Sequence, residues 1–521
     1  MLRRAAALLA VALPLSAQTP RAFRVDETTI ADIHAAMRGN RLSCHQLVQA
    51  YLERIDAYDK KGPAVNAITV VNPDALATAD SLDKRFASTK QLVGPLHCIP
   101  MIVKDNFQTI GLQTAAGNLA LKGYAPTKDA FQVARIKAAG AIVLAKSNMA
   151  EFAFSPYETV NSVLPGYTKN PYALDRVTAG SSGGTAAAVA ADFGEVGLGT
   201  DTGNSIRGPS SHQALVGIRS TMGLTSRAGI APLSLFADIA GPMARSVADA
   251  VAVFQVVAGY DPDDSATVAS KGRTIPNYAA SLDKNGLKGA RIGVLRQAFE
   301  SSNGGKDNVD PEVRAVFDRA IADLRKAGAT VIDTVLIPNA DSIRRSGGRG
   351  GCNPFKYEFN EWLAQQGPSV PVKSLDEIVK SGRYHPSIQA RLEAAARVEG
   401  NPDSIPGCQS RQRVREGLRD AVTRTMDGDK LDALIYPTWS YPPRLIGDLN
   451  TPAGDNSQVF SPTTGMPAIT VPMGYTRDNR LPAGMTIFGR AFDEPRLIKL
   501  AYAYEQATKW RKQPSSTPPL K

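Results

Sequence analysis

The sequence predicts an α/β fold in which helices sandwich a large, mostly parallel mixed sheet. Its 521 residues, 43% of them apolar and 7% aromatic, are typical of a globular protein that buries a large core. From residue 93 onward, short apolar runs alternate with helical segments, which is the pattern of βαβ units. Length leaves the number of domains open, because large α/β enzymes often fold as one unit.

The spacing of apolar residues predicts individual elements. Residues 27–59 carry apolar side chains at helical intervals, so we expect two amphipathic helices that cover one side of the core. Residues 99–103 predict a strand. Residues 130–139 predict a helix with Asp129 as its N-cap, and residues 141–145 predict the next strand.

The first 17 residues have the pattern of a signal peptide. Arg3 and Arg4 precede an apolar run, and Ser16 and Ala17 end the run with small side chains. We expect cleavage after Ala17 and export to the periplasm or the medium, the alternative being an N-terminal helix packed on the core. No later stretch approaches the roughly 20 uninterrupted apolar residues that a membrane span needs, so we expect a soluble protein without a membrane span.

We expect residues 26–512 to form a single domain. Within it, residues 345–410 are rich in glycine and proline and contain helical fragments, which predicts a helical and loop insertion that shapes the substrate cleft. An insertion that only adds packing is an equal alternative. Residues 513–521 are rich in proline and serine, and we expect a disordered tail there.

The net charge of +11 is mild for this length and indicates no nucleic-acid partner. Arg411, Arg413 and Arg415 alternate with polar residues in a predicted helix, where a solvated face is the favoured interpretation. A small molecule is therefore the expected partner. Self-association into a homo-oligomer is compatible with the sequence, which does not reveal it.

The four cysteines, Cys44, Cys98, Cys352 and Cys408, lack the CxxC spacing of zinc and redox sites. Cys352 and Cys408 lie in glycine-rich and proline-rich surroundings where loops approach each other, so a disulfide between them is an open alternative. Cys98 lies within an apolar run, and we expect a buried thiol there. We expect neither a metal nor an organic cofactor.

Two stretches rich in glycine and serine are candidates for chemistry. Residues 180–185, GSSGGT, precede a run of alanines, so their serines lie in a turn at the start of a helix. Residues 199–207, GTDTGNSIR, form a glycine-rich turn after an apolar run, and its outward backbone N–H groups could form an oxyanion hole. Neither stretch matches a phosphate loop or the GxGxxG fingerprint, so a serine nucleophile is the leading interpretation.

A serine nucleophile needs a base, and histidine is the usual one. Gly180-x-Ser182-x-Gly184 matches the nucleophile elbow of α/β-hydrolases, but no clean strand precedes it, which favours an accidental match. Lys104 follows the apolar run 98–103 and emerges from the end of a predicted buried strand, where burial would lower the pKa of its amine. Taken alone, such a lysine is more often a solvated surface charge.

In combination, these motifs resemble the amidase signature family. The resemblance covers most of the chain after the signal peptide, in the family's order, and rests on Gly94 to Leu96, Pro100 to Asn106, Gly180 to Gly184, Asp201 to Arg207, Gly465 to Pro472 and Pro482 to Met485. It implies the amidase signature fold and the activity of an amide hydrolase (an acylamide amidohydrolase). No cofactor is needed for this activity. Esters and carbamates are further substrate classes of that family.

The resemblance also implies a role for three side chains. Ser205 is the nucleophile, Ser181 carries a cis peptide bond and relays protons, and Lys104 is the base. Neutral Lys104 accepts a proton from Ser181, Ser181 accepts one from Ser205, and the alkoxide attacks the carbonyl carbon. The backbone N–H groups of residues 202–205 (Thr202, Gly203, Asn204 and Ser205) hold the oxyanion. Ser181 returns a proton to the leaving nitrogen, and water releases the acyl group.

Other residues of the same motifs have supporting roles. We expect Ser182 to order the turn and to hydrogen-bond the relay, with a helix cap as the equal alternative. We expect Asp201 and Arg207 to be structural partners in the loop. Asn204 stands where the family usually has glycine, and its tolerance of left-handed backbone geometry would preserve the turn. Residues 152–154 (Phe152, Ala153 and Phe154) lie where relatives line the acyl pocket, with core packing as the equal alternative.

Two other functions are compatible with these motifs. The first is a glutamine amidotransferase A-type subunit, which works inside the cell with partner proteins; the predicted signal peptide opposes it. The second is an exported solute-binding protein without turnover, which the presence of Lys104, Ser181 and Ser205 opposes.

Overall fold

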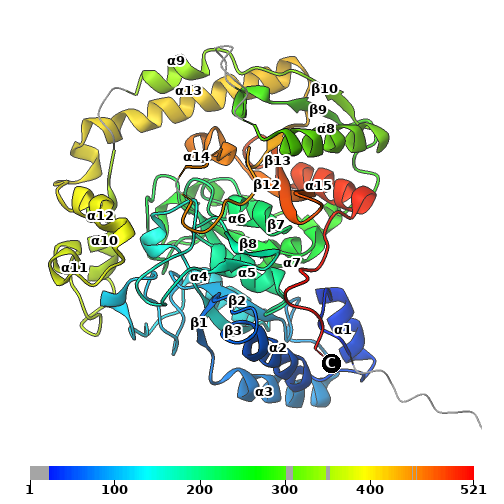
Figure 1. Cartoon of the computed structure of the whole chain (residues 1–521), viewed down its shortest axis with the longest axis vertical. Helices are drawn as coiled ribbons and strands as arrows, with labels where there is room; N and C mark the ends of the chain where they lie inside the picture. The colour runs from blue at the N-terminus through cyan, green and yellow to red at the C-terminus, as the bar shows by residue number, and fades with distance from the viewer. Residues whose placement is uncertain (1–22, 301–308, 348–351, 449, 453, 521) are drawn as a thin grey trace, which may run out of the picture.

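The computed structural model describes residues 23–300, 309–347, 352–448, 450–452 and 454–520, so the predicted signal peptide lies outside the described residues. An 11-stranded mixed sheet forms the centre of this part of the molecule (Figure 1). From one edge to the other, the strands are β1 (Ile68–Val71), β3 (Ile142–Ser147), β2 (Pro100–Lys104), β6 (Val196–Asp201), β8 (Ile239–Ala244), β7 (Val216–Arg219), β12 (Ala468–Thr476), β13 (Leu481–Phe488), β11 (Ala433–Pro437), β9 (Arg291–Val294) and β10 (Thr330–Ile332).

The predicted α/β sandwich around a large mixed sheet is confirmed, and its parallel pairs occupy two regions. β2 pairs in parallel with β3 and β6, and β9 pairs in parallel with β10 and β11. Pairs in the middle of the sheet, from β6 through β8, β7 and β12 to β13, are antiparallel. Parallel pairing is therefore less extensive than the apolar pattern predicts, in part because the short turn between β12 and β13 can join only antiparallel strands.

Fifteen α-helices surround this sheet within the described ranges. A row of helices in mutual contact, α4, α7, α15 and α8, packs against the sheet, and α5 and α6 form a second contacting pair. Their bounds are α1 (Ile30–Arg38), α2 (Cys44–Tyr58), α3 (Ala75–Thr89), α4 (Phe131–Ala138), α5 (Gly183–Ala190), α6 (Arg207–His212), α7 (Val247–Val257), α8 (Pro311–Lys326), α9 (Ala340–Arg345), α10 (Phe355–Ala364), α11 (Leu375–Ser381), α12 (Gln389–Ala396), α13 (Pro406–Gly428), α14 (Ser461–Thr464) and α15 (Glu494–Thr508).

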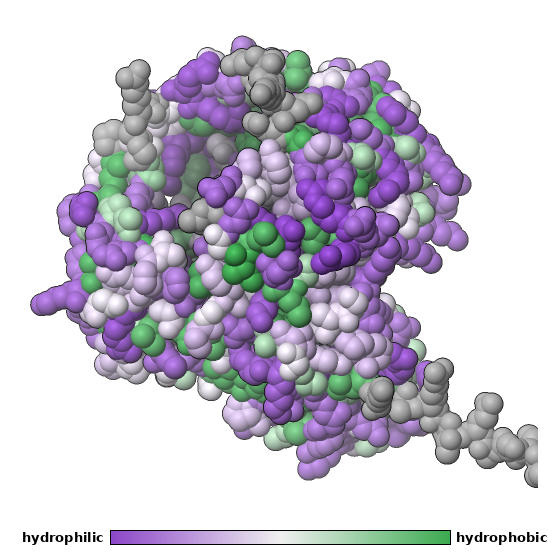
Figure 2. Space-filling view, in the orientation of Figure 1, coloured by the Kyte–Doolittle hydropathy of each residue, from purple (hydrophilic) through white to green (hydrophobic). Residues whose placement is uncertain are grey.

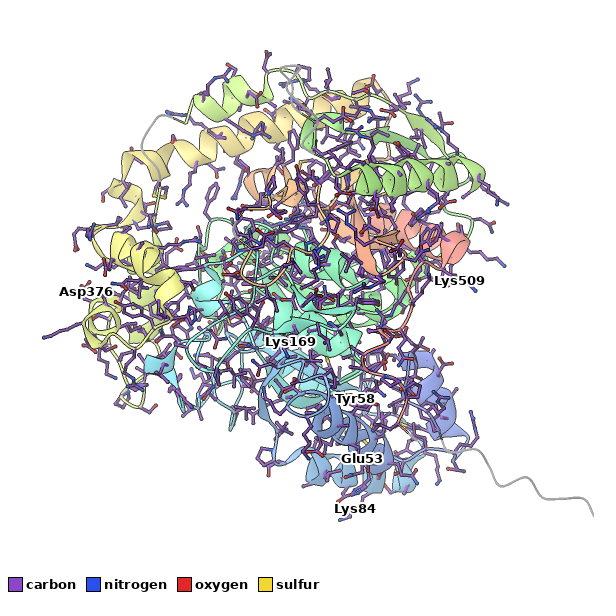
Figure 3. All side chains as sticks on the ribbon, viewed as in Figure 1. Glu53, Tyr58, Lys84, Lys169, Asp376 and Lys509 are labelled. Atoms are coloured by element: carbon purple, nitrogen blue, oxygen red, sulfur yellow. A yellow bond between two sulfur atoms is a disulfide. The ribbon has the colours of Figure 1, made fainter. Side chains whose placement is uncertain are left out.

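The first two helices confirm the amphipathic pattern, and each begins at a capping box. Thr29 and Ser43 accept a backbone N–H three residues later, and the side chain at that position binds back to the cap. Figure 3 places Glu53 of α2 and Lys84 of α3 at one end of the molecule, far from Asp376 of α11. The predicted N-cap Asp129 is wrong, because its carboxylate binds Lys137 and the backbone of Ile110 and α4 begins without a side-chain cap.

Residues 345–410 are mainly helical where they are described, and they contribute α10, α11, α12 and the start of α13. In Figure 1 these helices and α9 form an arm along one side of the sheet. Aromatic rings fasten the arm to the core, with Phe355 and Phe359 of α10 packed against Phe152. Figure 2 shows a mainly hydrophilic surface that is hollowed between α13 and the body of the molecule.

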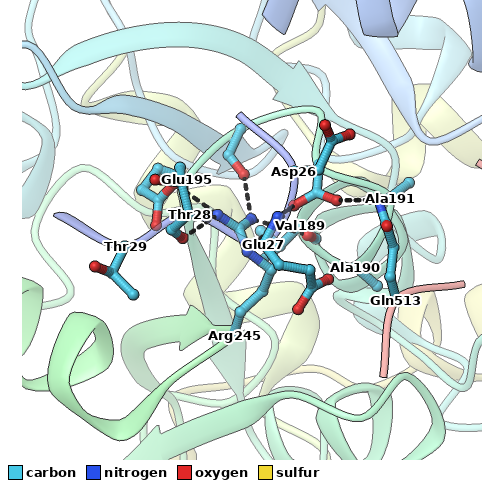
Figure 4. A network of polar contacts seen from close by, with 12 residues as sticks. Asp26, Glu27, Thr28, Thr29, Val189, Ala190, Ala191, Glu195, Arg245 and Gln513 are labelled. Atoms are coloured by element: carbon cyan, nitrogen blue, oxygen red, sulfur yellow. Dashed lines mark hydrogen bonds and ion pairs between the residues drawn. The ribbon is translucent and has the colours of Figure 1, made fainter. Parts of the chain in front are cut away.

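Both ends of the described chain are tied to a buried charged network around Arg245 (Figure 4). The Arg245 guanidinium donates to the carbonyl of Thr28 at 3.1 Å and to the carboxylate of Glu195 at 2.6 Å. The Gln513 amide donates to Asp192 at 3.1 Å, and Asp192 also pairs with Arg245. Each buried charge therefore has a partner of opposite sign or a hydrogen bond, as burial requires.

The expected disordered tail is not what the structure shows for residues 513–520. Thr517 is buried, and the backbone carbonyls of Thr517 and Pro518 accept hydrogen bonds from the buried guanidinium of Arg54 at 2.9 and 3.1 Å. Proline and serine content predicted a lack of core contacts. Here the tail is held by hydrogen bonds of its backbone carbonyls and of the Gln513 and Ser516 side chains, which composition does not reveal.

Two disulfides link segments that are distant in sequence. Cys352 and Cys408, whose pairing the sequence left open, are bonded and have Cα atoms 4.6 Å apart. Cys44 and Cys98 are also bonded, with a Cα separation of 5.6 Å, so the expected free thiol at Cys98 is wrong. Cys98 is buried as predicted, but the start of α2 brings Cys44 to it, a contact that local sequence does not indicate. Within the described residues, no helix is both long and apolar enough to cross a membrane.

Candidate active site

The candidate residues meet at one edge of the sheet. β2 and β6 are parallel neighbours, so Lys104 and Asp201, their last residues, lie at the same edge. Ser181 lies in the turn before α5, and Ser205 in the turn between β6 and α6. The backbone N–H of Ser182 donates to the carbonyl of Ser205 at 3.2 Å, which joins the two turns directly. Loops that follow parallel strands are a common place for active sites in α/β folds.

Lys104 is fully buried and its amine binds two hydroxyl groups. The Nζ of Lys104 lies 2.7 Å from the Oγ of Ser181 and 2.7 Å from the Oγ1 of Thr200. Asn106 also donates to the Thr200 hydroxyl, at 3.3 Å. Burial lowers the pKa of Lys104 from 10.5 to about 7, although the negative charges of Asp201 and Asp238 oppose the shift. The Lys104 amine is therefore neutral in a large fraction of the molecules near pH 7, and in this form it can accept a proton.

The turn that carries Ser181 is tightly enclosed. The peptide bond between Gly180 and Ser181 is cis, as the family resemblance implies. A Cβ atom at Gly180 would lie 2.5 Å from the carbonyl oxygens of Ser155 and Glu158, so only glycine fits there. Ser182 does not cap α5. Its hydroxyl instead donates to the carbonyl of Thr200 at 3.1 Å, which fastens the turn to β6.

Asn204 connects the Ser205 turn to the Ser181 turn. Its Nδ2 donates to the carbonyl of Pro156 at 3.2 Å, and the same carbonyl accepts the backbone N–H of Gly180 at 3.0 Å. The hydroxyl of Ser205 donates to the Oδ1 of Asn204 at 3.4 Å. The backbone φ of Asn204 is not positive, so the turn does not need a residue that tolerates left-handed geometry at this position. Asn204 instead links the Ser205 turn to the Ser181 turn through its buried side chain.

Asp201 anchors the start of the same turn as a buried carboxylate between two arginines. Arg207 Nε lies 3.0 Å from one oxygen of Asp201, and Arg219 Nη1 lies 3.0 Å from the other. The backbone N–H groups of Ile206 and Arg207 also donate to Asp201. Asp201 and Arg207 therefore bind each other within this loop. Arg219 was not predicted, because it lies on β7 and nothing in its local sequence marks it.

The backbone of the Ser205 turn offers unpaired donors. The N–H groups of residues 202–205 form no hydrogen bond within the described residues, whereas those of Ile206 and Arg207 are satisfied. Adjacent free N–H groups form a concave donor site for a negatively charged oxygen. Ser205 is only 4% exposed, so an oxyanion there would be largely shielded from water.

Sequence reasoning missed two side chains of this site. Thr200, inside the quoted GTDTGNSIR stretch, binds Lys104, and a hydroxyl next to a predicted buried lysine was a usable signal. Asp238 accepts a 2.5 Å hydrogen bond from the Thr202 hydroxyl and two more from the backbone of Leu233 and Ser234. Asp238 belongs to none of the motifs in the sequence analysis, so its contacts with the site are visible only in the folded loop.

The predicted acyl-pocket residues have different environments. Ala153 lines a small cavity beside Asn106, Thr200 and Thr202. Phe152 and Phe154 instead pack against the rings of α10, at centroid distances of 5.1 Å to Phe359 and 4.7 Å to Phe355, respectively. For the two phenylalanines, the geometry is that of core packing, and Ala153 alone of the three borders the cavity.

No histidine side chain takes part in this arrangement. None of the five imidazoles, all within the described ranges, hydrogen-bonds to Lys104, Ser181 or Ser205. His212 is the one nearest in sequence to Ser205; its ring packs against Trp439, and burial lowers its pKa to about 3. Among the described residues, no group of three or more histidine, cysteine, aspartate or glutamate side chains is arranged to hold a metal ion.

Known proteins resemble this chain over nearly its whole length. The family model named Amidase matches residues 46–498. A protein of Arabidopsis thaliana named as a probable amidase is 34% identical over 511 residues, covering 94% of this chain and 92% of its own length. The A subunit of glutamyl-tRNA(Gln) amidotransferase from Alkalilimnicola ehrlichii is 32% identical and covers 94% of this chain and 98% of its own length.

Solved structures give the same result for the fold. The native peptide amidase of Stenotrophomonas maltophilia superposes with a TM-score of 0.83 at 35% identity, covering 95% of this chain and 99% of the other. A bacterial aryl acylamidase, 22% identical, superposes with a TM-score of 0.75 over 93% of this chain and 96% of the other.

Proposed function

The chain belongs to the amidase signature family, and the relatives that it resembles include amidases. We propose that it hydrolyses linear amides through an acyl-enzyme on Ser205. The observation that carries the proposal is the buried contact between Lys104 and Ser181, 2.7 Å between Nζ and Oγ, beside the turn that holds Ser205. Lysine replaces histidine as the base because burial keeps its amine partly neutral near pH 7.

In the proposed reaction, the amine of Lys104 accepts the proton of Ser181 while Ser181 accepts that of Ser205. The Ser205 oxygen then attacks the amide carbonyl. The N–H groups of residues 202–205 stabilise the oxyanion, since they bind no other group in the described chain. Ser181 next protonates the leaving nitrogen, which is the demanding step for an amide, and water hydrolyses the ester of Ser205 through the same relay.

A substrate panel tests the proposal. The purified chain should release the amine from at least one of short amides, peptide-terminal amides, aryl anilides, esters and carbamates, and Ser205→Ala should abolish that release. Peptide-terminal amides are the first class to test, because a peptide amidase is among the most similar solved structures. Unchanged turnover in Ser205→Ala would refute the proposed nucleophile.

A glutamine amidotransferase A-type subunit is the second candidate, because such subunits are about as similar to this chain as the plant amidase. Such a subunit acts with partner proteins, so isolated chain that hydrolyses simple amides but not glutamine favours the first candidate. The solute-binding alternative has no support, since the similar proteins are enzymes. We also propose export, on the signal-peptide pattern alone, and N-terminal analysis of extracellular or periplasmic protein that begins after Ala17 would verify it.

A further inference from the structure

A group of arginines lies on α13, outside the candidate active site. Arg411, Arg415 and Arg419 follow one another at intervals of four residues and therefore share one side of the helix. The sequence favoured a solvated face for this segment, and Arg413 is indeed exposed. Arg415 is only 8% exposed, and Arg411 and Arg419 are partly buried. The expectation of a solvated face is therefore wrong for the side that carries these three.

The protein holds these guanidinium groups in place without neutralising them. Arg415 donates to the carbonyls of Thr463 and Phe236 at 3.0 and 2.5 Å, and Arg419 donates twice to the carbonyl of Thr464 at 3.0 and 2.7 Å. These bonds occupy Nε and Nη2 of each side chain. Within the described residues, Nη1 of both side chains makes no hydrogen bond.

No carboxylate contacts these side chains within the described residues, although Glu358 acts on Arg411, and Glu416 and Asp420 act on Arg419, as more distant negative charges. No ion pair within the described ranges involves Arg411, Arg415 or Arg419, although Arg219 and Arg227 nearby are paired with aspartates. Burial lowers the pKa of Arg415 to about 9, and the charges of four other arginines add to the shift. Burying a cation among like charges costs free energy, which a bound anion would offset.

An open cavity of about 420 Å³ lies against these side chains, with Arg415 and Arg419 in its wall. Apolar side chains form much of the rest, including Met222, Phe236 and Phe492. The guanidinium groups of Arg411 and Arg415 lie 4.4 and 3.5 Å from the ring centroid of Phe236, which is within the range of cation–π contacts. This volume is within the range of cavities that hold small organic molecules.

We propose that this cavity is a binding site for a small organic carboxylate with an apolar body. The carboxylate would accept hydrogen bonds from the free Nη1 groups of Arg415 and Arg419, and hydrogen bonds between charged groups are stronger than those between neutral groups. Arg411, which contacts Phe236 but does not line the cavity, adds long-range attraction. The apolar part of the ligand would contact Met222 and Phe492. Nothing in this site depends on the proposed function of Ser205.

The cavity has a structural connection to the candidate active site. Arg227 and Leu235 line both this cavity and the small cavity beside Thr200. They belong with Phe236 and Asp238 to one stretch of chain, in which Phe236 contacts the arginines and Asp238 binds Thr202. A carboxylate bound at α13 would therefore lie on the other side of the loop that supports the Ser205 turn.

Calorimetric titration of benzoate into the full-length protein at constant ionic strength tests the site. We expect saturable binding of one benzoate, with no comparable binding of benzyl alcohol, which has the same ring without the charge. Arg419→Gln should weaken binding at least tenfold, and Arg411→Gln should weaken it by a smaller factor. Arg413→Gln is the matched control, because it removes one positive charge from the exposed side of the same helix, and it should bind as the wild type does.

Three results would overturn the site: benzoate binding no stronger than that of benzyl alcohol, equal weakening by Arg413→Gln and Arg419→Gln, or loss of binding in Ser205→Ala. The last would place benzoate in the active site instead. Benzoate binding that persists in Ser205→Ala supports the site even if the amidase proposal fails. Circular dichroism of each variant establishes whether it is folded. If Arg419→Gln does not fold, Arg411→Gln still tests the site.

Discussion

The Nζ of Lys104 lies 2.7 Å from the Oγ of Ser181, and both side chains are fully buried. A permanent ammonium charge at this depth would be costly, and no carboxylate within the described chain forms an ion pair with Lys104. The amine is therefore bound by hydroxyl groups, from Ser181 and Thr200, which can exchange protons with it. This contact is what makes a relay without histidine physically feasible.

Activity should depend on pH through Lys104. Burial lowers the pKa of its amine to about 7, and only the neutral form can accept a proton, so the rate should rise with pH up to about 7 and level off above it. Lys104→Arg keeps the positive charge at all pH values and should lower kcat by roughly 10²–10⁴-fold, the usual effect of losing a general base. Lys122→Arg, an exposed control, should leave the profile unchanged. A flat pH–rate profile in the wild type would contradict this role.

Asn204 should position the nucleophile through its bond to the Pro156 carbonyl, which Gly180 shares. An aspartate at this position would have nearly the same shape as the native side chain, but it could not donate, and its charge would repel the carbonyl. Asn204→Asp should therefore lower kcat about 10²-fold, with little change in KM, because small displacements of reacting groups are costly. Asn204→Ala removes the bond without the repulsion and should have a smaller effect. Unaltered kcat in Asn204→Asp would refute the cross-link.

Asp201 should be important for stability because its removal leaves Arg207 and Arg219 buried without their counter-ion. Asp201→Asn should lower the free energy of unfolding by about 3–5 kcal/mol, measured by urea denaturation. Asp56→Asn, which removes an exposed ion pair with Lys61, should change it by less than about 1 kcal/mol. If both substitutions lowered the free energy of unfolding equally, burial would not be the reason why Asp201 is important for stability.

The same carboxylate gives stability a defined pH dependence. Burial alone would raise its pKa, but Arg207 and Arg219 outweigh burial and lower the pKa from 3.8 to about 2. The unfolded chain therefore binds the proton first, so the contribution of Asp201 is complete above about pH 4 and is lost as the pH falls toward 2. In Asp201→Asn, this part of the acid dependence should disappear.

Both disulfides should form in the oxidised protein. Thiol titration of the denatured, unreduced chain should find no free cysteine, and four free thiols would refute both bonds. Each bond closes a loop of more than 50 residues, so removing one should cost about 4 kcal/mol if its effect is mainly on the unfolded chain. Cys44 and Cys98 are fully buried, so a mild reductant should open the Cys352–Cys408 bond first.

Local sequence patterns were sufficient for much of this fold and site. Apolar spacing located β2, β3, α1 and α2 to within a few residues, because each buries one face or one run of side chains. The contact between Lys104 and Ser181 was implied by the resemblance to the amidase signature family, and local sequence by itself placed only Lys104 at the end of a strand. Contacts between distant segments could not be read in this way.

Three contacts are of this kind: that of Arg219 with Asp201, that of Asp238 with Thr202, and the Cys44–Cys98 bond. Each joins positions whose own neighbours in sequence give no signal, and the topology of the sheet decides which of them meet. The contacts of the tail after residue 512 were hidden for a related reason, because its backbone carbonyls and the side chains of Gln513 and Ser516 bind residues that are far away in the sequence. Burial of Arg415 was hidden similarly, since Phe236 and α14 cover it from elsewhere in the chain.

The identity of the nucleophile is tested most directly by covalent labelling. Wild-type protein, treated with a fluorophosphonate and digested, should carry one phosphonyl group on the peptide that contains Ser205, and Ser205→Ala should carry none. Ser181→Ala and Lys104→Ala should label the same peptide more slowly, because the relay would be broken while Ser205 remains. A label on Ser181 or Ser182, or undiminished labelling in Ser205→Ala, would contradict the proposed mechanism.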